Sequence, residues 1–401
     1  MNEMKTTTER GYAGDIDQLR ARVRRFVEEA AIPLESPALA HDVAALDAAI
    51  AQLRKRARDD GIYAPQLPPR WGGLGLDWRQ CAAVLEEAGR GFLAPAAMNC
   101  APPDQPNMLT LLAIGSAAQQ ARYLGPLARG EARACFAMTE PSPGAGSDPA
   151  MLATRAERRG GRWVLNGRKM FISGGVGAAF ALVLARTDAG ASLFIVNADA
   201  PGYRVVRDIG MATGYQVGGH AEILLQDCEV DDEALLGEPG RGFEYAQLRL
   251  EPARLSHCMR YIGRAARALE LAQGYVQQRE SFGARLADLQ QVQAMVADSH
   301  IDLHASRLMT ADCAAALDAG RSVKHLSSMT KVFVSEAVNR VADRAVQMMG
   351  ALGVSDETPV SMIWRELRPF RIYDGANELH RATLARRILR PASPLLSTGK
   401  S

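Results

Sequence analysis

The sequence lacks the features that would direct it to nucleic acid or into a membrane. Its 401 residues include 47 basic and 45 acidic side chains, giving a net charge of +2 at pH 7. This balance argues against nucleic acid as the main partner, because such proteins carry dense basic patches. The longest apolar run, residues 178–185, is far shorter than the roughly 20 residues that cross a bilayer, so no membrane span is expected.

Motifs for metal binding and thiol redox chemistry are also missing. None of the six cysteines has CxxC spacing, which excludes a thiolate zinc cage and predicts buried free thiols in a reducing compartment. His300 and His304 lie one helical turn apart but lack the glutamate of the HExxH motif, so no metal site is expected. Residues 1–16 are polar, and we expect neither a secretory signal nor a transit peptide. These observations predict a cytoplasmic protein.

The hydrophobic pattern changes character twice along the chain. Residues 1–133 follow a helical period and predict an all-α domain. Residues 134–240 hold short apolar runs bounded by Gly, Asp and Asn, typical of an antiparallel barrel or sandwich and not of a parallel dinucleotide-binding sheet. Residues 241–401 predict long helices in a bundle, in which Pro252 should kink or restart the first helix.

Six segments rich in glycine, aromatic and polar residues are the candidates for chemistry. In chain order they are CFAMTEPSPGAGSD (135–148), WVLNGRKMFISGG (163–175), LGEPGRGF (236–243), RESFG (279–283), QMMGALG (347–353) and IYDGANELHR (372–381). In this order, on a helix–β–helix layout, they resemble the acyl-CoA dehydrogenase family over about residues 15–390. Residues 99–108, 219–223 and 254–260 are similar to the branch that contains family members 10 and 11. The resemblance implies an α+β multidomain fold that ends in a four-helix bundle.

The family's activity would be FAD-dependent α,β-dehydrogenation of an acyl-CoA thioester to the trans-2-enoyl-CoA, a step of fatty acid β-oxidation. In that reaction a base takes a proton from C2, a hydride passes from C3 to flavin N5, and an electron-transfer flavoprotein accepts the electrons. Asp374 matches the base, although most of the family carries Glu there, and its N–H would donate to the thioester carbonyl. Some members place the base at the position of Ala253, so Glu251 is the alternative carboxylate. Taken alone, Asp-Gly is an ordinary turn dipeptide.

The resemblance also assigns the flavin contacts. The matching residues are Phe136, Met138, Thr139, Ser147, Phe171, Ile172, Ser173, Arg279, Phe282, Gln290, Gln347, Gly350, Ala351, Gly353, Ala376 and Glu378. Phe171 stands where Trp is common and would stack on the ring without an indole donor. Outside this context, Phe171 would be a core strand residue, and Arg279 and Glu378 would be surface charges. In the family, the groups from Arg279 to Gly353 reach a flavin held mainly by the neighbouring subunit, which implies a homodimer or homotetramer.

Substrate contacts and alternative activities complete the expectations. The residues that match substrate contacts are Ser147, Glu251, Arg254 and Gly375. Ser142 and Pro143 are additional to the family's usual spacing, so either Ser142 or Ser147 could meet the pantetheine arm. Two other activities stay open: a flavin oxidase or monooxygenase of the same superfamily that uses oxygen, and a non-catalytic subunit of a mixed dehydrogenase. The acyl group itself is not defined by the sequence.

Overall fold

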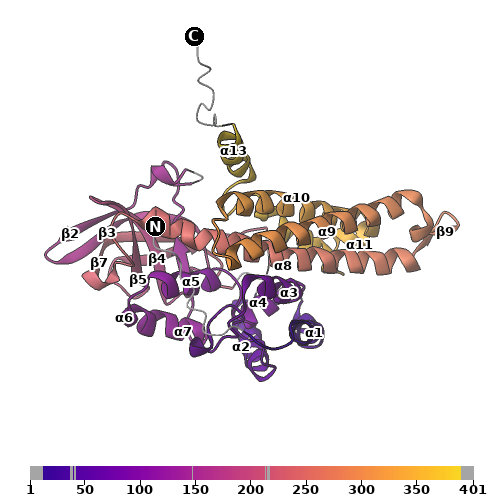
Figure 1. Cartoon of the computed structure of the whole chain (residues 1–401), viewed down its shortest axis with the longest axis horizontal. Helices are drawn as coiled ribbons and strands as arrows, with labels where there is room; N and C mark the ends of the chain where they lie inside the picture. Colours follow the sequence, from indigo (N-terminus) through magenta and orange to yellow (C-terminus); the bar gives the residue numbers. More distant parts are fainter. Residues whose placement is uncertain are drawn as a thin grey trace, which may run out of the picture.

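The computed structural model describes residues 12–36, 39, 42–146, 148–212, 214 and 217–389. Ser147, expected to contact both flavin and substrate, lies outside these residues. Figure 1 shows an N-terminal helical part below a long helical bundle, with a β domain at one end of that bundle. The predicted order of helical, β and helical parts is confirmed. The boundaries at 133/134 and 240/241 stay a prediction.

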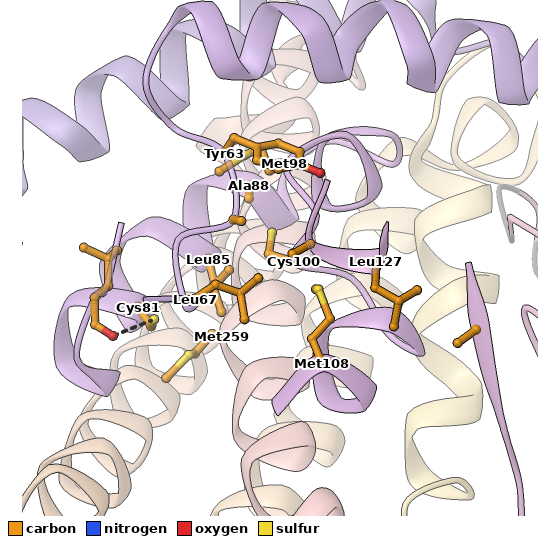
Figure 2. Packing of buried hydrophobic residues seen from close by; sticks show 14 of the residues in the cluster. Tyr63, Leu67, Cys81, Leu85, Ala88, Met98, Cys100, Met108, Leu127 and Met259 are labelled. Atoms are coloured by element: carbon orange, nitrogen blue, oxygen red, sulfur yellow. Dashed lines mark hydrogen bonds between the residues drawn. The ribbon is translucent and has the colours of Figure 1, made fainter. Parts of the chain in front are cut away.

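The N-terminal part is a cluster of short helices. They are α1 (Ile16–Phe26), α2 (Val43–Asp59), α3 (Trp78–Gly89), α4 (Ala94–Ala97), α5 (Asp104–Ile114), α6 (Ala117–Gln119) and α7 (Gly125–Ala128). Asp77 begins α3 with a capping box: its side chain accepts from the Gln80 N–H, and the Gln80 side chain accepts from the Asp77 N–H. Figure 2 shows Leu67, Cys81 and Leu85 of this core near Met259 of the bundle. The N-terminal core is therefore continuous with the helix that carries part of the site.

The middle part is a seven-stranded sheet in the described residues. Its strands are β1 (Ala134–Ala137), β2 (Arg155–Arg159), β3 (Arg162–Ser173), β4 (Phe180–Thr187), β5 (Gly190–Asn197), β6 (Tyr203–Asp208) and β7 (His220–Asp231). The hydrogen-bonded order is β1-β4-β2-β3-β7-β6, with β5 also paired to β4. Most pairs are antiparallel as predicted, but β1 runs parallel to β4, and β2 meets β4 in parallel at one position. The long connection through β2 and β3 makes a parallel return possible.

The C-terminal part is built on three long helices. Its elements are α8 (Gly242–Gln278), β8 (Glu280–Ser281), β9 (Ala284–Arg285), α9 (Gln290–Asp318), α10 (Lys324–Met349), α11 (Ala351–Val354), α12 (Val360–Leu367) and α13 (Asn377–Ile388). Of the two alternatives at Pro252, a restart of the first helix is wrong, because α8 runs through this residue without a break, and a kink there stays a prediction. Proline removes one helical hydrogen bond, and packing of α8 against α3, α5, α9 and α10 offsets that loss.

Single-turn and irregular helices fill the connections. They are η1 (Val27–Ala31), η2 (Ile32–Leu34), η4 (Pro69–Trp71), η5 (Gln120–Leu124), η6 (Pro149–Met151), η7 (Asp232–Ala234), η8 (Leu286–Asp288) and η9 (Arg368–Arg371). The last of these, η9, leads directly into the turn that carries Asp374, the residue expected to be the base.

Helix α8 crosses α3 at very close range. A Cβ on Gly263 would lie 1.8 Å from the Glu86 carbonyl oxygen, and a Cβ on Gly89 would lie 2.0 Å from the Arg260 carbonyl oxygen. Arg264 then donates to the carbonyls of Gly89, at 2.6 Å, and Gly91, at 2.7 Å. Glycine at both crossing positions therefore sets how α8 lies against the N-terminal part.

Three expectations about composition can be compared with the described residues. All six cysteines are buried free thiols, as predicted. Within those residues no helix is long and apolar enough to cross a bilayer. The same residues contain no cluster of potential metal ligands, and His300 instead lies 2.9 Å from the Gln273 amide.

Candidate active site

Asp374 lies in a strained turn between η9 and α13. Its φ is 54°, in the left-handed region that Asp tolerates better than most residues. Gly375 follows with a φ of 93°, and a Cβ there would lie 2.7 Å from the His380 Nε2 atom. Glycine is therefore required beside Asp374. Strain of this kind persists where surrounding contacts fix the backbone and is concentrated at functional sites.

Buried cations fix this turn through its carbonyl groups. Arg254 of α8 donates from Nε to the Asp374 carbonyl at 2.8 Å. Lys331 of α10 is fully buried and donates from Nζ to the Gly375 carbonyl at 2.7 Å and to Oδ1 of Asn377 at 2.8 Å. Burial lowers the pKa of Lys331 to about 8. The turn is thus held from both α8 and α10, which makes its geometry rigid.

The carboxylate of Asp374 is desolvated and not fully hydrogen-bonded. Its Oδ2 atom is buried and has no hydrogen-bond donor among the described residues. Burial raises the pKa of Asp374 above its ordinary value, although the nearby charges of Arg254, Arg249 and Lys331 oppose the rise. A desolvated carboxylate with an unsatisfied oxygen is a stronger base than one in water.

His257 of α8 is the polar side chain facing that oxygen. Its Nε2 atom lies 3.5 Å from Oδ2 of Asp374. Burial and the charges of Arg260, Arg249 and Lys331 lower the pKa of His257 well below its ordinary value. The contact therefore joins a carboxylate to a neutral imidazole and is not an ion pair.

Arg249 lies between the Asp374 turn and the β domain. It is buried, donates from Nε to Oδ1 of Asn107 at 2.8 Å, and places its guanidinium 4.1 Å from the Phe136 ring centre. Burial lowers the pKa of Arg249 to about 10, and its charge still acts on Asp374. Phe136 and Asp374, more than 200 residues apart in sequence, therefore lie around one buried arginine.

The two expected flavin segments of the β domain adjoin one another. The Met170 N–H donates to the Thr139 carbonyl at 2.9 Å, and Nζ of buried Lys169 donates to the Met138 carbonyl at 3.1 Å. Lys169 also pairs with buried Glu140 at 2.8 Å. These bonds hold the strand end at 136–139 against the second segment.

Phe171 is presented to solvent by a bulge in β3. Its φ is 59° and it is 48% exposed, at the register shift between Lys169 and Ile172. Ile172 faces inward and is buried, so only its backbone is available to a ligand. Ser173 is half-buried, with its hydroxyl 3.1 Å from Nδ1 of His220. An exposed aromatic ring on a strained bulge is not a core strand residue and can stack on a flat ligand.

A second group of expected flavin residues lies far from Asp374 within the same chain. Arg279 and Gln290 flank the β8–β9 hairpin, whose tip carries Phe282 at 95% exposure. Figure 1 shows this hairpin at the end of the bundle remote from the β domain. From Arg254 to the end of α8 the helix advances about 36 Å, at about 1.5 Å per residue. The structure does not bring this group to Asp374 within one chain.

The remaining expected residues divide between the two ends of the bundle. Gln347, Gly350 and Ala351 are exposed at the α10–α11 junction, while Gly353 is buried against Val346. At the other end, Ala376 is half-buried and Glu378 is exposed where α13 begins.

The expected substrate residues lie on and around α8. Arg254 donates to the Asp374 carbonyl, and Gly375 is the next residue of the same turn. Glu251 lies one turn before Arg254 and is half-buried, and burial raises its pKa. Ser142 is exposed in the loop after β1.

These residues fit a flavin dinucleotide. Thr139 and Ser173 supply polar groups, Phe171 supplies an exposed aromatic face, and the unsatisfied carboxylate of Asp374 faces the same buried arginine as Phe136. Arg279 offers an exposed guanidinium of the kind that binds phosphate.

Sequence reasoning missed several residues that shape the site. They are Arg249, His257, Arg260, Lys331, Asn377 and His380. A signal was present in α8, where Arg260, Arg264 and Arg267 recur at the helical spacing of a buried face. Charged residues in the phase of a core stripe indicate buried polar partners.

Comparisons with known protein families cover nearly the whole chain. The N-terminal, middle and C-terminal domain models of acyl-CoA dehydrogenase match residues 14–131, 135–228 and 240–389. The probable acyl-CoA dehydrogenase FadE2 of Mycobacterium tuberculosis is 37% identical over 348 residues, 84% of each chain.

The expected branch is also found. Acyl-CoA dehydrogenase family member 11 of Gallus gallus is 36% identical over 84% of this chain and 44% of its own length. Family member 10 of Mus musculus is 33% identical over 96% of this chain and 38% of its own length. This chain thus spans less than half of those two relatives.

Solved structures agree with the sequence relatives. Butyryl-CoA dehydrogenase from Megasphaera elsdenii has a TM-score of 0.82 at 26% identity and covers 94% of this chain and 99% of its own. Acyl-CoA dehydrogenase from Geobacillus kaustophilus has a TM-score of 0.82 at 27% identity, covering 94% and 98%. The chain is therefore a member of the acyl-CoA dehydrogenase family of FAD-dependent oxidoreductases.

Proposed function

We propose that this protein desaturates an acyl-CoA thioester between C2 and C3, giving the trans-2-enoyl-CoA, with Asp374 as the base. The observation that carries the proposal is the buried Oδ2 of Asp374, which has no hydrogen-bond donor among the described residues and a raised pKa. A C2 proton is weakly acidic, so its removal needs a desolvated base and a polarised thioester carbonyl. The backbone N–H of Asp374 supplies that polarisation.

The protein's own groups position and activate the acyl thioester. Arg254 and Lys331 hold the turn through its carbonyls, so Asp374 keeps a fixed backbone position although its side chain is one methylene shorter than Glu. Bound FAD would accept the C3 hydride at N5. Phe136, Thr139, Phe171 and Ser173 would hold its ring.

The distant group on the bundle supports an oligomer. Arg279 and Phe282 lie too far from Asp374 to complete the same chain's flavin site, so a homodimer or homotetramer would bring them to a neighbour's FAD. An electron-transfer flavoprotein is the proposed acceptor. The buried free thiols support a reducing, cytoplasmic setting.

Stopped-flow bleaching of the FAD absorbance without oxygen tests this function. Purified protein is mixed with a panel of acyl-CoA thioesters, and wild type is compared with Asp374→Asn and Glu251→Gln. Asp374→Asn should keep its FAD and lose bleaching by at least about a hundredfold, the lower range for a general base. Glu251→Gln should still bleach, with its main effect on substrate affinity.

Each other outcome has a definite meaning. If Asp374→Asn bleaches normally and Glu251→Gln does not bleach, the base is Glu251 on α8 and not Asp374. Rapid reoxidation of the reduced protein by air, without an added acceptor, would favour an oxidase or monooxygenase. A purified protein that takes up no FAD and never bleaches would contradict catalysis and favour a non-catalytic subunit.

A further inference from the structure

We propose that His257 is a positioning residue for the base: when substrate binds, the 3.5 Å contact shortens and the neutral imidazole donates from Nε2 to Oδ2 of Asp374, which fixes the orientation of that carboxylate. The inference rests on the proposed function, in which Asp374 removes the C2 proton. It concerns a residue on α8, 117 positions before Asp374 in the chain.

The imidazole packs against three aromatic rings. Its centre lies 5.0 Å from the Tyr373 ring, 5.6 Å from Phe370 and 5.7 Å from Tyr261. Only 10% of its side chain is exposed. A ring packed in this way cannot turn freely, so the direction of its Nε2 atom is set by the protein core.

The partners of its two nitrogens select one tautomer. The Tyr373 hydroxyl lies 3.4 Å from Nδ1, and Oδ2 of Asp374 lies 3.5 Å from Nε2. The Tyr373 hydroxyl donates its own proton to the Tyr261 hydroxyl at 2.7 Å, so the carboxylate decides the tautomer. An ionised Asp374 repels a lone pair and attracts an N–H more strongly than a neutral hydroxyl does, and the proton therefore belongs on Nε2. The distance is long for a hydrogen bond, as is common for catalytic contacts before substrate tightens them.

The surrounding charges keep this imidazole neutral. The groups facing His257 and Asp374 are Arg249, Arg254 and Arg260 of α8, Lys331 of α10, and the hydroxyls of Tyr261 and Tyr373. With so many cations nearby, a protonated His257 is disfavoured, and burial lowers its pKa further. The residue can therefore donate a hydrogen bond without adding a charge that would weaken the base.

A set of three variants tests the role in flavin bleaching. His257→Leu removes the donor, His257→Gln returns an amide nitrogen near the Nε2 position, and His257→Asn carries one that is too short to reach Asp374. His304→Leu on the exposed face of α9 is the matched control. The measurements are FAD content, kcat and KM for turnover with an artificial electron acceptor, and the pH profile of kcat.

Loss of the donor should slow kcat about tenfold, the effect of one hydrogen bond to a charged group, with KM changed less than about twofold. The acid limb should move about one unit to higher pH, because the ionised form of Asp374 loses a donor. His257→Gln should recover most of the lost kcat and most of the shift in the pH profile, whereas His257→Asn should recover neither. If Leu disturbs folding, the polar Gln and Asn pair carries the test.

The results separate this inference from the function beneath it. If Asp374→Asn does not bleach but His257→Leu has the wild-type kcat and the wild-type fall of kcat at low pH, the positioning role is refuted and the base assignment stands. Equal rates for the Gln and Asn variants would also refute it, because a packing role does not depend on where the amide lies. Normal bleaching by Asp374→Asn would instead overturn the base assignment.

Discussion

Replacing Lys169 by Met should open the loop that follows β1, which carries part of the expected flavin contact. Lys169 is fully buried and donates to Oε1 of Glu140 at 2.8 Å, to the Leu184 carbonyl at 2.7 Å and to the Met138 carbonyl at 3.1 Å. Its removal leaves the buried Glu140 carboxylate without its cation. Breaking such a pair costs roughly 3–5 kcal/mol.

The structure places the loss at the lower end of that range. Glu140 keeps backbone N–H donors from Ala145 at 3.0 Å, Ala153 at 2.7 Å and Thr154 at 2.9 Å. A cost of about 3 kcal/mol corresponds to about a hundredfold rise in the opening equilibrium of the loop. Arg168→Met is the matched control, since Arg168 is half exposed and its pair with Glu222 is worth less than about 1 kcal/mol.

Hydrogen exchange of peptides covering residues 138–154, measured by mass spectrometry, reports the opening directly. FAD content after gel filtration gives the functional consequence. We expect faster exchange and lower flavin occupancy for Lys169→Met, and partial recovery when Glu140→Gln is added. Exchange equal to that of Arg168→Met would refute the reasoning, because the pair would then hold nothing in place.

The same pair gives a pH dependence with a defined sign. Burial alone would raise the pKa of Glu140, but Lys169 and the hydrogen bonds hold it at about 2, below its ordinary 4.5. A depressed carboxyl pKa contributes stability above pH 4.5, and this is lost as pH falls toward 2. Lys169, whose pKa burial lowers to about 8, stays charged at neutral pH. In Lys169→Met burial raises the pKa of Glu140 without the opposing cation, so the acid-induced loss of stability between pH 4.5 and 2 should become smaller than in the wild type.

Further predictions concern the helix crossing, the flavin and the base. Gly263→Ala should lower the thermal midpoint markedly, because its Cβ would meet the Glu86 carbonyl, whereas Gly274→Ala on the same helix has open space and should be neutral or stabilising by less than about 1 kcal/mol. Equal midpoints for the two variants would contradict the close crossing. Arg279→Ala should lose FAD during gel filtration, and unchanged occupancy would exclude a phosphate contact. The bleaching rate should rise with pH through the raised pKa of Asp374, since only the ionised carboxylate accepts a proton; a rate that falls over this range would contradict its role as base.

The sequence by itself determined the order of helical, β and helical parts, since periodicities of 3.6 and 2 residues are local properties. The resemblance of its motifs to a known family also singled out the Tyr-Asp-Gly turn, which taken alone is an ordinary turn sequence. The alternative of a helix restart at Pro252 is wrong, because tertiary packing carries α8 through a local helix breaker.

Only the tertiary structure decided which distant groups surround Asp374. Arg249 and His257 look like ordinary helix residues until α8 is packed against the turn from residue 373 onward. Their neutral or lowered-pKa states depend on burial among other cations, which no local pattern encodes. The same folding carries Arg279 and Phe282 to the far end of the bundle, because a continuous helix separates residues in proportion to their distance along the chain.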